Sequence, residues 1–191
     1  MAAKIFSDED RKRPTKADLE AAREKTVKDI IRPRLHVLFV GINPGLYTAA
    51  IGHHFGRPGN RFWPALNLSG LLRHPLSPYE SEKLLKSDIG ITNIVSRATA
   101  RADELSREEL RRGAHLLTRK ILRYKPDHAA FLGLGLYREA FDHPRARVGL
   151  QREKIGNTWL WVFPNPSGLN AHWQIPDYAR MFRRLLPNPY R

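Results

Sequence analysis

Two short runs of this chain combine glycine, proline and amide side chains, a composition that can hold a polar group rigidly. The first, Gly-Ile-Asn-Pro-Gly-Leu at residues 41–46, places Asn43 on a turn whose proline fixes the backbone and whose glycines permit unusual shapes. The second, Asn-Pro-Ser-Gly-Leu at residues 165–169, ends on the apolar Leu169. A rigid carboxamide suits the mouth of a pocket, and an exposed leucine on a basic protein suits wedging into a stack of bases. Taken alone, an ordinary strand-to-loop turn and a buried loop leucine explain the two runs as well.

Four apolar segments, each followed by a turn or a loop, predict strands. The first, Val-Leu-Phe-Val at residues 37–40, does not alternate with polar residues, which indicates a strand buried on both faces of a parallel sheet. Strands alternate with helical patterns, so we predict an α/β fold with three αβα layers and a short, mainly parallel central sheet. The strands are expected at residues 37–40, 89–95, 129–132 and 157–163, and the helices at 15–31, 61–68, 77–86, 106–124, 134–141 and 176–186.

Helix starts are marked by hydroxyl and acidic residues at the spacing of N-terminal caps. Ser106 precedes Glu109 by three residues, the pattern of a capping box, and Leu105 and Leu110 can form a hydrophobic staple around it. The segment 47–60 is expected to be a long loop, and loops of this length in compact domains are often functional. Because ligands of open α/β sheets bind beyond the carboxyl ends of the strands, the runs at 41–46 and 165–169 could open on the same edge.

The composition favours a polyanionic partner. The chain has 191 residues, with 33 Lys and Arg against 19 Asp and Glu, for a net charge of +14. Such a balance is typical of proteins that bind nucleic acid, although solubility alone could also explain it. The chain has no cysteine, which excludes disulfides, thiolate metal sites and a cysteine nucleophile. No run reaches about 18 apolar residues, so we expect a soluble intracellular protein and no membrane partner.

Other chemical motifs are weak or missing. Gly-Leu-Gly at residues 133–135 follows a strand, but Arg138 stands where a dinucleotide-binding fingerprint needs its third glycine. His53 and His54 are adjacent, and adjacent residues rarely bind one metal ion, so we expect no metal site. The sequence has no phosphate-binding loop, nucleophile elbow or zinc-protease motif.

Four motifs in order resemble the mismatch-specific uracil/thymine-DNA glycosylases of the uracil-DNA glycosylase superfamily. They are the runs at 41–46 and 165–169, the segment Gly-His-His-Phe-x-x-Pro-Gly-Asn-x-Phe-Trp at 52–63, and Gly-Ile-Thr-Asn-Ile-Val at 90–95. The similarity extends from about Asp29 to Leu185. We therefore expect residues 1–28 to form a charged N-terminal arm and helix, and residues 29–191 a single glycosylase domain.

The resemblance implies an enzyme that flips uracil, or thymine opposite guanine, out of duplex DNA and hydrolyses the N-glycosyl bond to initiate base excision repair. By this analogy Asn43 positions the attacking water, where faster members of the superfamily carry an aspartate. Phe55 would stack on the flipped base. The base pocket would comprise Ile42, His54, Phe55, Asn60 and Asn93, and the wedge that fills the vacated stack Ser167, Gly168, Leu169 and Asn170.

The residue types fit this chemistry. Uracil leaves as an anion, which backbone N–H groups and amide side chains can stabilise. An asparagine cannot take the proton of the water, so a slow enzyme is expected, with no metal or organic cofactor. Relatives often carry an arginine just after the wedge, where this chain has Ala171 and His172, which puts the reading of the opposite guanine in doubt.

The resemblance also carries expectations about context. It implies a monofunctional enzyme, because neither glycine-rich loop carries a lysine, and a monomer that acts on double-stranded DNA with G·U or G·T mispairs. A cytoplasmic, nucleoid-associated location in a prokaryote would follow. Two alternatives stay open: a nucleic-acid-binding module without catalysis, and a glycosylase for another damaged base or for single strands.

Overall fold

The computed structural model describes residues 13–168, 170 and 172–186. In this part of the chain, five strands form one sheet in the order β2-β1-β3-β5-β4. The first four of these run parallel to one another, and β4 pairs antiparallel with β5 at the edge. The strands are β1 (Val37–Gly41), β2 (Ile89–Asn93), β3 (His128–Leu132), β4 (Gly149–Ile155) and β5 (Thr158–Phe163).

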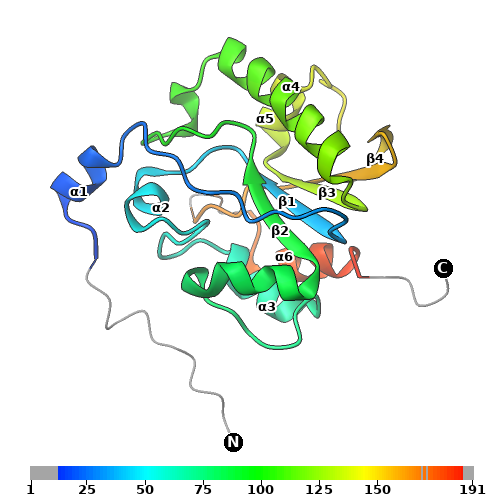
Figure 1. Ribbon diagram of the computed structural model, residues 1–191, viewed down its shortest axis with the longest axis horizontal. Helices are drawn as coiled ribbons and strands as arrows, with labels where there is room; N and C mark the ends of the chain where they lie inside the picture. The colour runs from blue at the N-terminus through cyan, green and yellow to red at the C-terminus, as the bar shows by residue number, and fades with distance from the viewer. Residues whose placement is uncertain (1–12, 169, 171, 187–191) are drawn as a thin grey trace, which may run out of the picture.

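Helices cover both faces of the sheet (Figure 1), which confirms the predicted three-layer α/β fold. One face packs against α3 (Phe62–Ser69), the 3-10 helix η2 (Pro78–Ser87) and α6 (Ile175–Arg183). The other packs against α4 (Arg107–Tyr124) and α5 (Leu134–Ala140). Three short helices complete the described chain: α1 (Lys16–Ala21), α2 (Leu46–Ile51) and the 3-10 helix η3 (Ala102–Glu104).

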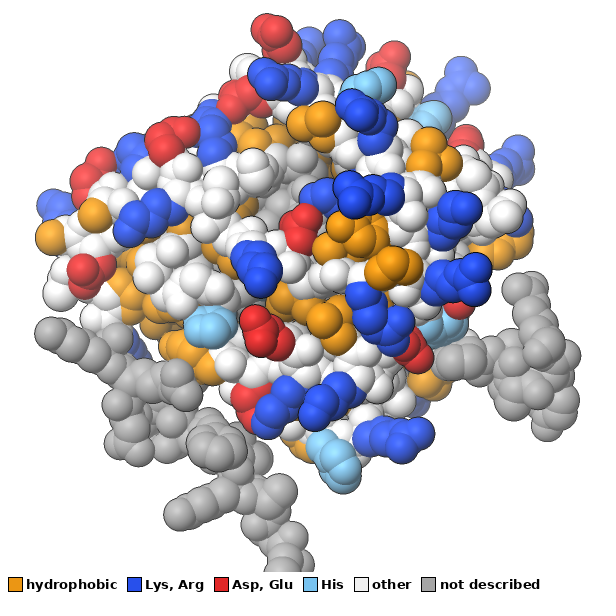
Figure 2. Space-filling model, viewed as in Figure 1, with side chains coloured by type: hydrophobic (Ala, Val, Ile, Leu, Met, Phe, Trp, Pro, Cys, Tyr) orange, Lys and Arg blue, Asp and Glu red, His pale blue; other side chains and the backbone are white. Residues whose placement is uncertain are grey.

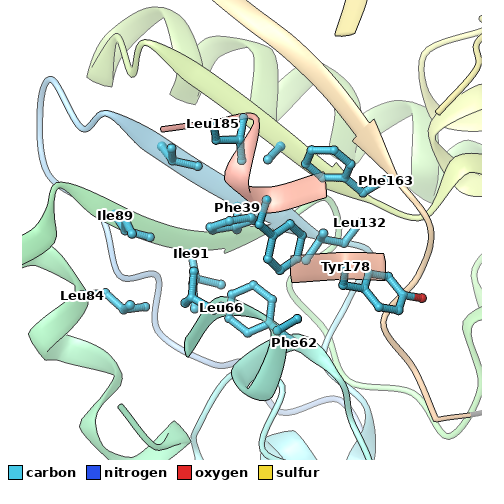
Figure 3. Close-up of a cluster of buried hydrophobic side chains, with 14 of the residues drawn as sticks. Phe39, Phe62, Leu66, Leu84, Ile89, Ile91, Leu132, Phe163, Tyr178 and Leu185 are labelled. Atoms are coloured by element: carbon cyan, nitrogen blue, oxygen red, sulfur yellow. The ribbon is translucent and has the colours of Figure 1, made fainter. Parts of the chain in front are cut away.

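Strand β1 lies in the middle of the hydrophobic core. Its side chains alternate between the two faces: Phe39 packs with α3 and α6, whereas Leu38 and Val40 pack with α4. All three are fully buried. Figure 3 shows Phe39 surrounded by aromatic and aliphatic side chains, with the ring of Phe62 at 5.1 Å between centroids. This burial on both faces confirms the prediction for residues 37–40, and it anchors the turn that follows at the carboxyl edge.

The predicted helix over residues 15–31 is wrong beyond its first turns. Thr15 caps α1, but α1 ends at Ala21, and Glu24 adopts a left-handed backbone with φ of 67°. The rest of the segment is extended, with isolated bridges from Thr26 to Arg97 and from Ile30 to Ile91. Its apolar side chains enter three different clusters rather than one helix face, so the segment lies along the sheet domain instead of forming a separate helix.

The predicted loop over residues 47–60 is also wrong in its first part, because α2 occupies residues 46–51. Gly52, which read as a loop signal, ends this helix with φ of 73°. Only residues 53–61 connect α2 to α3 as a loop. The capping box at Ser106 and Glu109 is confirmed, and the flanking Leu105 and Leu110 are both buried.

Candidate active site

The two segments that leave β1 and β2 at the carboxyl edge continue side by side beyond the sheet. The amide of Ile94 donates to the carbonyl of Gly41 at 2.9 Å, and the amide of Val95 donates to the carbonyl of Ile42 at 2.9 Å. Further on, the amide of Thr99 donates to the carbonyl of Pro44 at 3.2 Å. These bonds fix the backbone on both sides of Asn43, so the turn at residues 41–45 is held by its neighbour as well as by its own proline and glycines.

The side-chain amide of Asn43 is oriented by two acceptors. Its Nδ2 donates to the carbonyl of Arg97 at 3.1 Å and to Oγ1 of Thr99 at 2.7 Å. A carbonyl oxygen can only accept, so it must face the NH2 group, and the hydroxyl of Thr99 is itself engaged as a donor to the carbonyl of Arg101 at 2.7 Å. Within the described residues Oδ1 of Asn43 accepts no hydrogen bond, which leaves its lone pairs available to a water molecule.

Buried His54 lies beside Asn93. The ring of His54 is 2 % exposed, and its Nε2 lies 3.0 Å from the carbonyl of Lys28, which requires a proton on Nε2. Burial lowers the pKa of His54, so the neutral ring is favoured. Its Nδ1 is then an acceptor, and it lies 3.5 Å from Nδ2 of Asn93.

Gly41, Phe55 and Asn93 meet at the end of β1. A Cβ atom added to Gly41 would clash with Oδ1 of Asn93 and would lie 3.2 Å from Cζ of Phe55, so a side chain at this position would displace the amide of Asn93. Phe55 has φ of 54°, a left-handed conformation that is rare for a bulky residue and is often found at binding sites. Its half-buried ring packs on Phe62 at 4.3 Å between centroids. The strained backbone thus holds an aromatic ring beside an amide at the carboxyl edge.

Two of the expected pocket residues also have roles in holding the fold. Oδ1 of Asn60 accepts from the amide of Phe62 at 2.9 Å at the start of α3. The side chain of Ile42 is buried in the core beneath α4 and α5, and its carbonyl is bonded to Val95. Contacts of Ile42 and Asn60 with a base stay predictions.

The loop at residues 165–170 lies against the loop that precedes α3. The guanidinium of Arg61 donates to the carbonyl of Ser167 at 2.8 Å, and a Cβ atom at Gly168 would lie 2.9 Å from the carbonyl of Gly59. Asn170 closes the turn through its amide, 3.0 Å from the carbonyl of Ser167. Leu169 lies outside the described residues, so its role as a wedge stays a prediction.

The sequence reasoning missed two groups that contact Asn43: the carbonyl of Arg97 and the hydroxyl of Thr99. Thr99 is 2 % exposed and belongs to none of the motifs at residues 41–46, 52–63, 90–95 and 165–169. The one signal that could have found it is topological. The segment after β2 leaves the sheet next to the segment after β1, so polar residues in either are candidates to contact Asn43.

No other surface feature of the described residues offers an alternative candidate site. A cavity of about 400 Å³ lies at the amino ends of the strands, where Arg34, Asp127 and Asn157 contribute to its wall, and it includes none of the candidate residues. Among the described residues, no group of three or more His, Asp or Glu side chains could hold a metal ion. In the same part of the chain, no helix is long and apolar enough to cross a membrane.

Fold and site together define an α/β protein with amide and aromatic side chains at the carboxyl edge of a mainly parallel sheet. The family model of the uracil DNA glycosylase superfamily matches residues 28–187, and the chain belongs to this superfamily. The resemblance drawn from the motifs is thereby confirmed at the level of the superfamily. Membership indicates a DNA glycosylase, an enzyme that hydrolyses N-glycosyl bonds in DNA during base excision repair.

Proposed function

We propose that this protein is a monofunctional DNA glycosylase that excises uracil, and thymine, from G·U and G·T mispairs in duplex DNA. The observation that carries the proposal is the fixed amide of Asn43. Its NH2 group is bound on one side by Arg97 and Thr99, so its oxygen is presented to solvent-borne ligands. A group held in one orientation contributes to rate by keeping a reactant in attack geometry.

In this mechanism Oδ1 of Asn43 accepts a hydrogen bond from a water molecule and directs the water at C1′ of the flipped nucleotide. The oxygen of the water bonds to C1′ as the C1′–N1 bond breaks, and the electron pair of the C1′–N1 bond leaves with the base. The water proton passes to solvent or to the departing base, because an amide cannot take it. The general-base contribution of about 10²–10⁴ in rate is therefore forgone, and a slow enzyme is expected.

The base would be bound between Phe55 and Asn93. Stacking on an aromatic ring contributes about 1–3 kcal/mol for an unpaired base. Nδ2 of Asn93 can donate to His54 at 3.5 Å, which leaves its oxygen on the side of Gly41, where it can accept from N3–H of uracil or thymine. The wedge of Ser167, Gly168, Leu169 and Asn170 would fill the gap in the duplex, since extrusion of a base costs a few kcal/mol and least at mismatches.

The monofunctional assignment rests on the absence of lysine from residues 41–46 and 165–170. An enzyme that also cleaves the abasic strand needs an amine nucleophile near C1′. The basic surface suits the phosphate backbone of DNA. Figure 2 shows Lys and Arg side chains spread over the viewed face, with fewer Asp and Glu between them.

The experiment is a panel of duplex and single-stranded oligonucleotides that carry uracil, thymine, hypoxanthine or ethenocytosine opposite guanine. Abasic sites are revealed by alkaline cleavage under single-turnover conditions, with Asn43→Ala as the inactive control. The proposal is supported if the unaltered protein releases uracil from G·U duplex and Asn43→Ala does not. Release of a different base, or cutting of single strands in preference, assigns another substrate. Binding without release by both proteins identifies a nucleic-acid-binding module.

A further inference from the structure

Residues 22–27 lie just before the part of the chain that matches the superfamily, and they run along the loop that holds Asn43. The amide of Glu24 donates to the carbonyl of Ala98 at 3.3 Å, and the amide of Ala98 donates to the carbonyl of Lys25 at 2.8 Å. Thr26 forms an antiparallel bridge with Arg97. The loop at 97–99 is therefore bonded to this segment at Ala98, and its flanking residues Arg97 and Thr99 bind Asn43.

A separate apolar cluster lies under this contact. Ala22 and Ala98 are fully buried and pack together with Val27 and Ala49. Ala49 belongs to α2, the helix that directly follows the turn of Asn43, and α1 lies next to α2 (Figure 1). The cluster thus joins the N-terminal segment to both segments that carry the site.

Ion pairs also connect the N-terminal segment to the loop at 97–99 and to the start of α4. Arg97 binds Glu109 of α4 at 2.5 Å from Nε to Oε1, and it binds Glu24 at 3.1 Å. Arg23 binds Glu104 at 3.2 Å. Exposed pairs of this kind contribute little one by one, but here they link the N-terminal segment, the loop and the start of α4 in one network.

We propose that residues 22–27 form a positioning segment of the active site, which keeps the carbonyl of Arg97 and the hydroxyl of Thr99 in place to orient the amide of Asn43. The inference rests on the proposed function of Asn43. If the loop at 97–99 shifts, the amide of Asn43 is no longer held and the water loses its attack geometry. The rate of the chemical step then falls, whereas binding of DNA, which uses other groups, is retained.

Two neighbouring alanines offer a matched test. Ala22 is fully buried in the cluster, and Ala21 is exposed at the end of α1. We expect Ala22→Leu to lower the single-turnover rate on G·U duplex at least about tenfold, because added volume pushes the segment from the loop. The dissociation constant for an abasic-site duplex should change less than about twofold. Ala21→Leu adds the same atoms on the outside and should leave rate and affinity unchanged.

A coupling experiment separates positioning from general loss of structure. If the segment acts in part through Thr99, the effect of Ala22→Leu should be smaller in a Thr99→Val background, because the hydroxyl contact is already lost and only the contact with Arg97 can still be disturbed. Fully multiplicative effects of the two changes would contradict the proposal. Should Ala22→Leu lower the melting temperature so far that the protein does not fold, Val27→Ala is the smaller change in the same cluster, with an expected loss in rate of about threefold.

The results distinguish this inference from the proposed function. An unaltered protein that releases uracil, together with equal rates for Ala22→Leu and Ala21→Leu at equal stability, overturns the positioning segment alone. An unaltered protein that releases no base overturns the proposed function. A parallel loss of rate and DNA affinity in Ala22→Leu would likewise contradict a role confined to positioning.

Discussion

The oxygen and the nitrogen of the Asn43 amide have different tasks. The nitrogen is fixed by Arg97 and Thr99, and the oxygen accepts no bond from the described residues. Because only the nitrogen of the amide is bound, the oxygen remains a free acceptor that points in a defined direction. Such an acceptor can orient a water molecule for attack. On the proposed mechanism, the geometry of attack therefore depends on Arg97 and Thr99 as well as on Asn43.

Thr99 gives the first prediction at this scale. Thr99→Val keeps the shape of the side chain but removes the acceptor for Nδ2 of Asn43 and the bond to Arg101. A single hydrogen bond contributes about 0.5–1.5 kcal/mol, so the single-turnover rate on G·U duplex should fall about twofold to tenfold. Thr99→Ser retains the hydroxyl and should restore most of the rate. Equal rates in the two variants would show that the hydroxyl is not used.

The second prediction concerns Asn43 itself. Asn43→Asp should retain release of uracil, because a carboxylate can orient the water and also take its proton. The rate should then rise about tenfold per pH unit while the carboxyl group is mostly protonated, and level off above its pKa. The unaltered protein, whose amide does not titrate, should lack this rise. Rate profiles of both proteins over the same pH range test the difference.

Not every residue of the site could be predicted from the sequence. Asn43, Phe55 and Asn93 lie within motifs whose glycines and prolines mark a special backbone, and these motifs carry the resemblance to the superfamily. Thr99 is separated from Asn43 by 56 positions and has no distinctive neighbours. Its contact arises only because β1 and β2 are adjacent in the sheet, which is a property of the fold.

At the scale of elements, the strands with buried runs were the most predictable part of the fold. Strands β1, β2, β3 and β5 fall on the four predicted runs, with ends that differ by one or two residues. Strand β4 was missed because it lies at the edge, and Arg152, Glu153 and Lys154 in it are exposed and charged. An edge strand buries little and gives no apolar signal.

Helix α4 is stabilised at its start by a carboxylate with a second task, and this gives the third prediction. Glu109 caps α4 through the amide of Ser106 and binds Arg97, and these contacts, that with Arg97 first, lower its pKa to about 2. A lowered pKa in the folded state stabilises the protein above the unfolded value of about 4.5, and this stabilisation is lost as pH falls toward about 2. Glu109→Gln should therefore lower the urea midpoint of unfolding at pH 7. The difference in urea midpoint between the unaltered protein and Glu109→Gln should become smaller between pH 4.5 and pH 3.

Glu108, its exposed neighbour, provides the control for this measurement. The same change at Glu108 removes an equal charge from the first turn of α4, so it reports the effect of the helix dipole alone. Should Glu108→Gln lower the urea midpoint as much as Glu109→Gln does, with the same dependence on pH, that result would contradict a special role of the ion pair between Glu109 and Arg97.

The loop at 165–170 gives the fourth prediction. Leu169→Ala should slow excision from G·U duplex strongly and from single strands little, because only a duplex has a continuous stack that a wedge must keep open. Truncation of a buried core leucine would instead cost about 2–5 kcal/mol of stability, and excision from both substrates would then slow to a similar extent. Rates on both substrates and the melting temperature, measured on one preparation, distinguish the two readings.

At the scale of the whole molecule, the proposed function predicts that charge sets the affinity for DNA and the response of this affinity to salt. The chain carries 33 basic and 19 acidic residues, and Figure 2 shows Lys and Arg side chains spread over the viewed face. Binding that releases counterions weakens with salt, with a slope of about −0.9 per phosphate neutralised in a plot of log affinity against log salt. The chemical step at saturating enzyme involves no such release, so its rate should change little.

The last prediction uses two exposed arginines at opposite ends of the domain. Arg57 lies between Phe55 and Gly59, and Gly59 contacts the loop at 165–170. Arg73 follows α3, whose last carbonyls bind Arg183 of α6, and the segment after α6 binds His36 just before β1, at the amino edge of the sheet. If DNA lies across the carboxyl edge, Arg57→Gln should reduce the salt slope of binding to a G·U duplex by about one, and Arg73→Gln should leave it unchanged. Both variants lose the same charge, so any effect of net charge cancels between them. Equal slopes for the two variants would mean that the duplex does not lie across the edge where Asn43 is held.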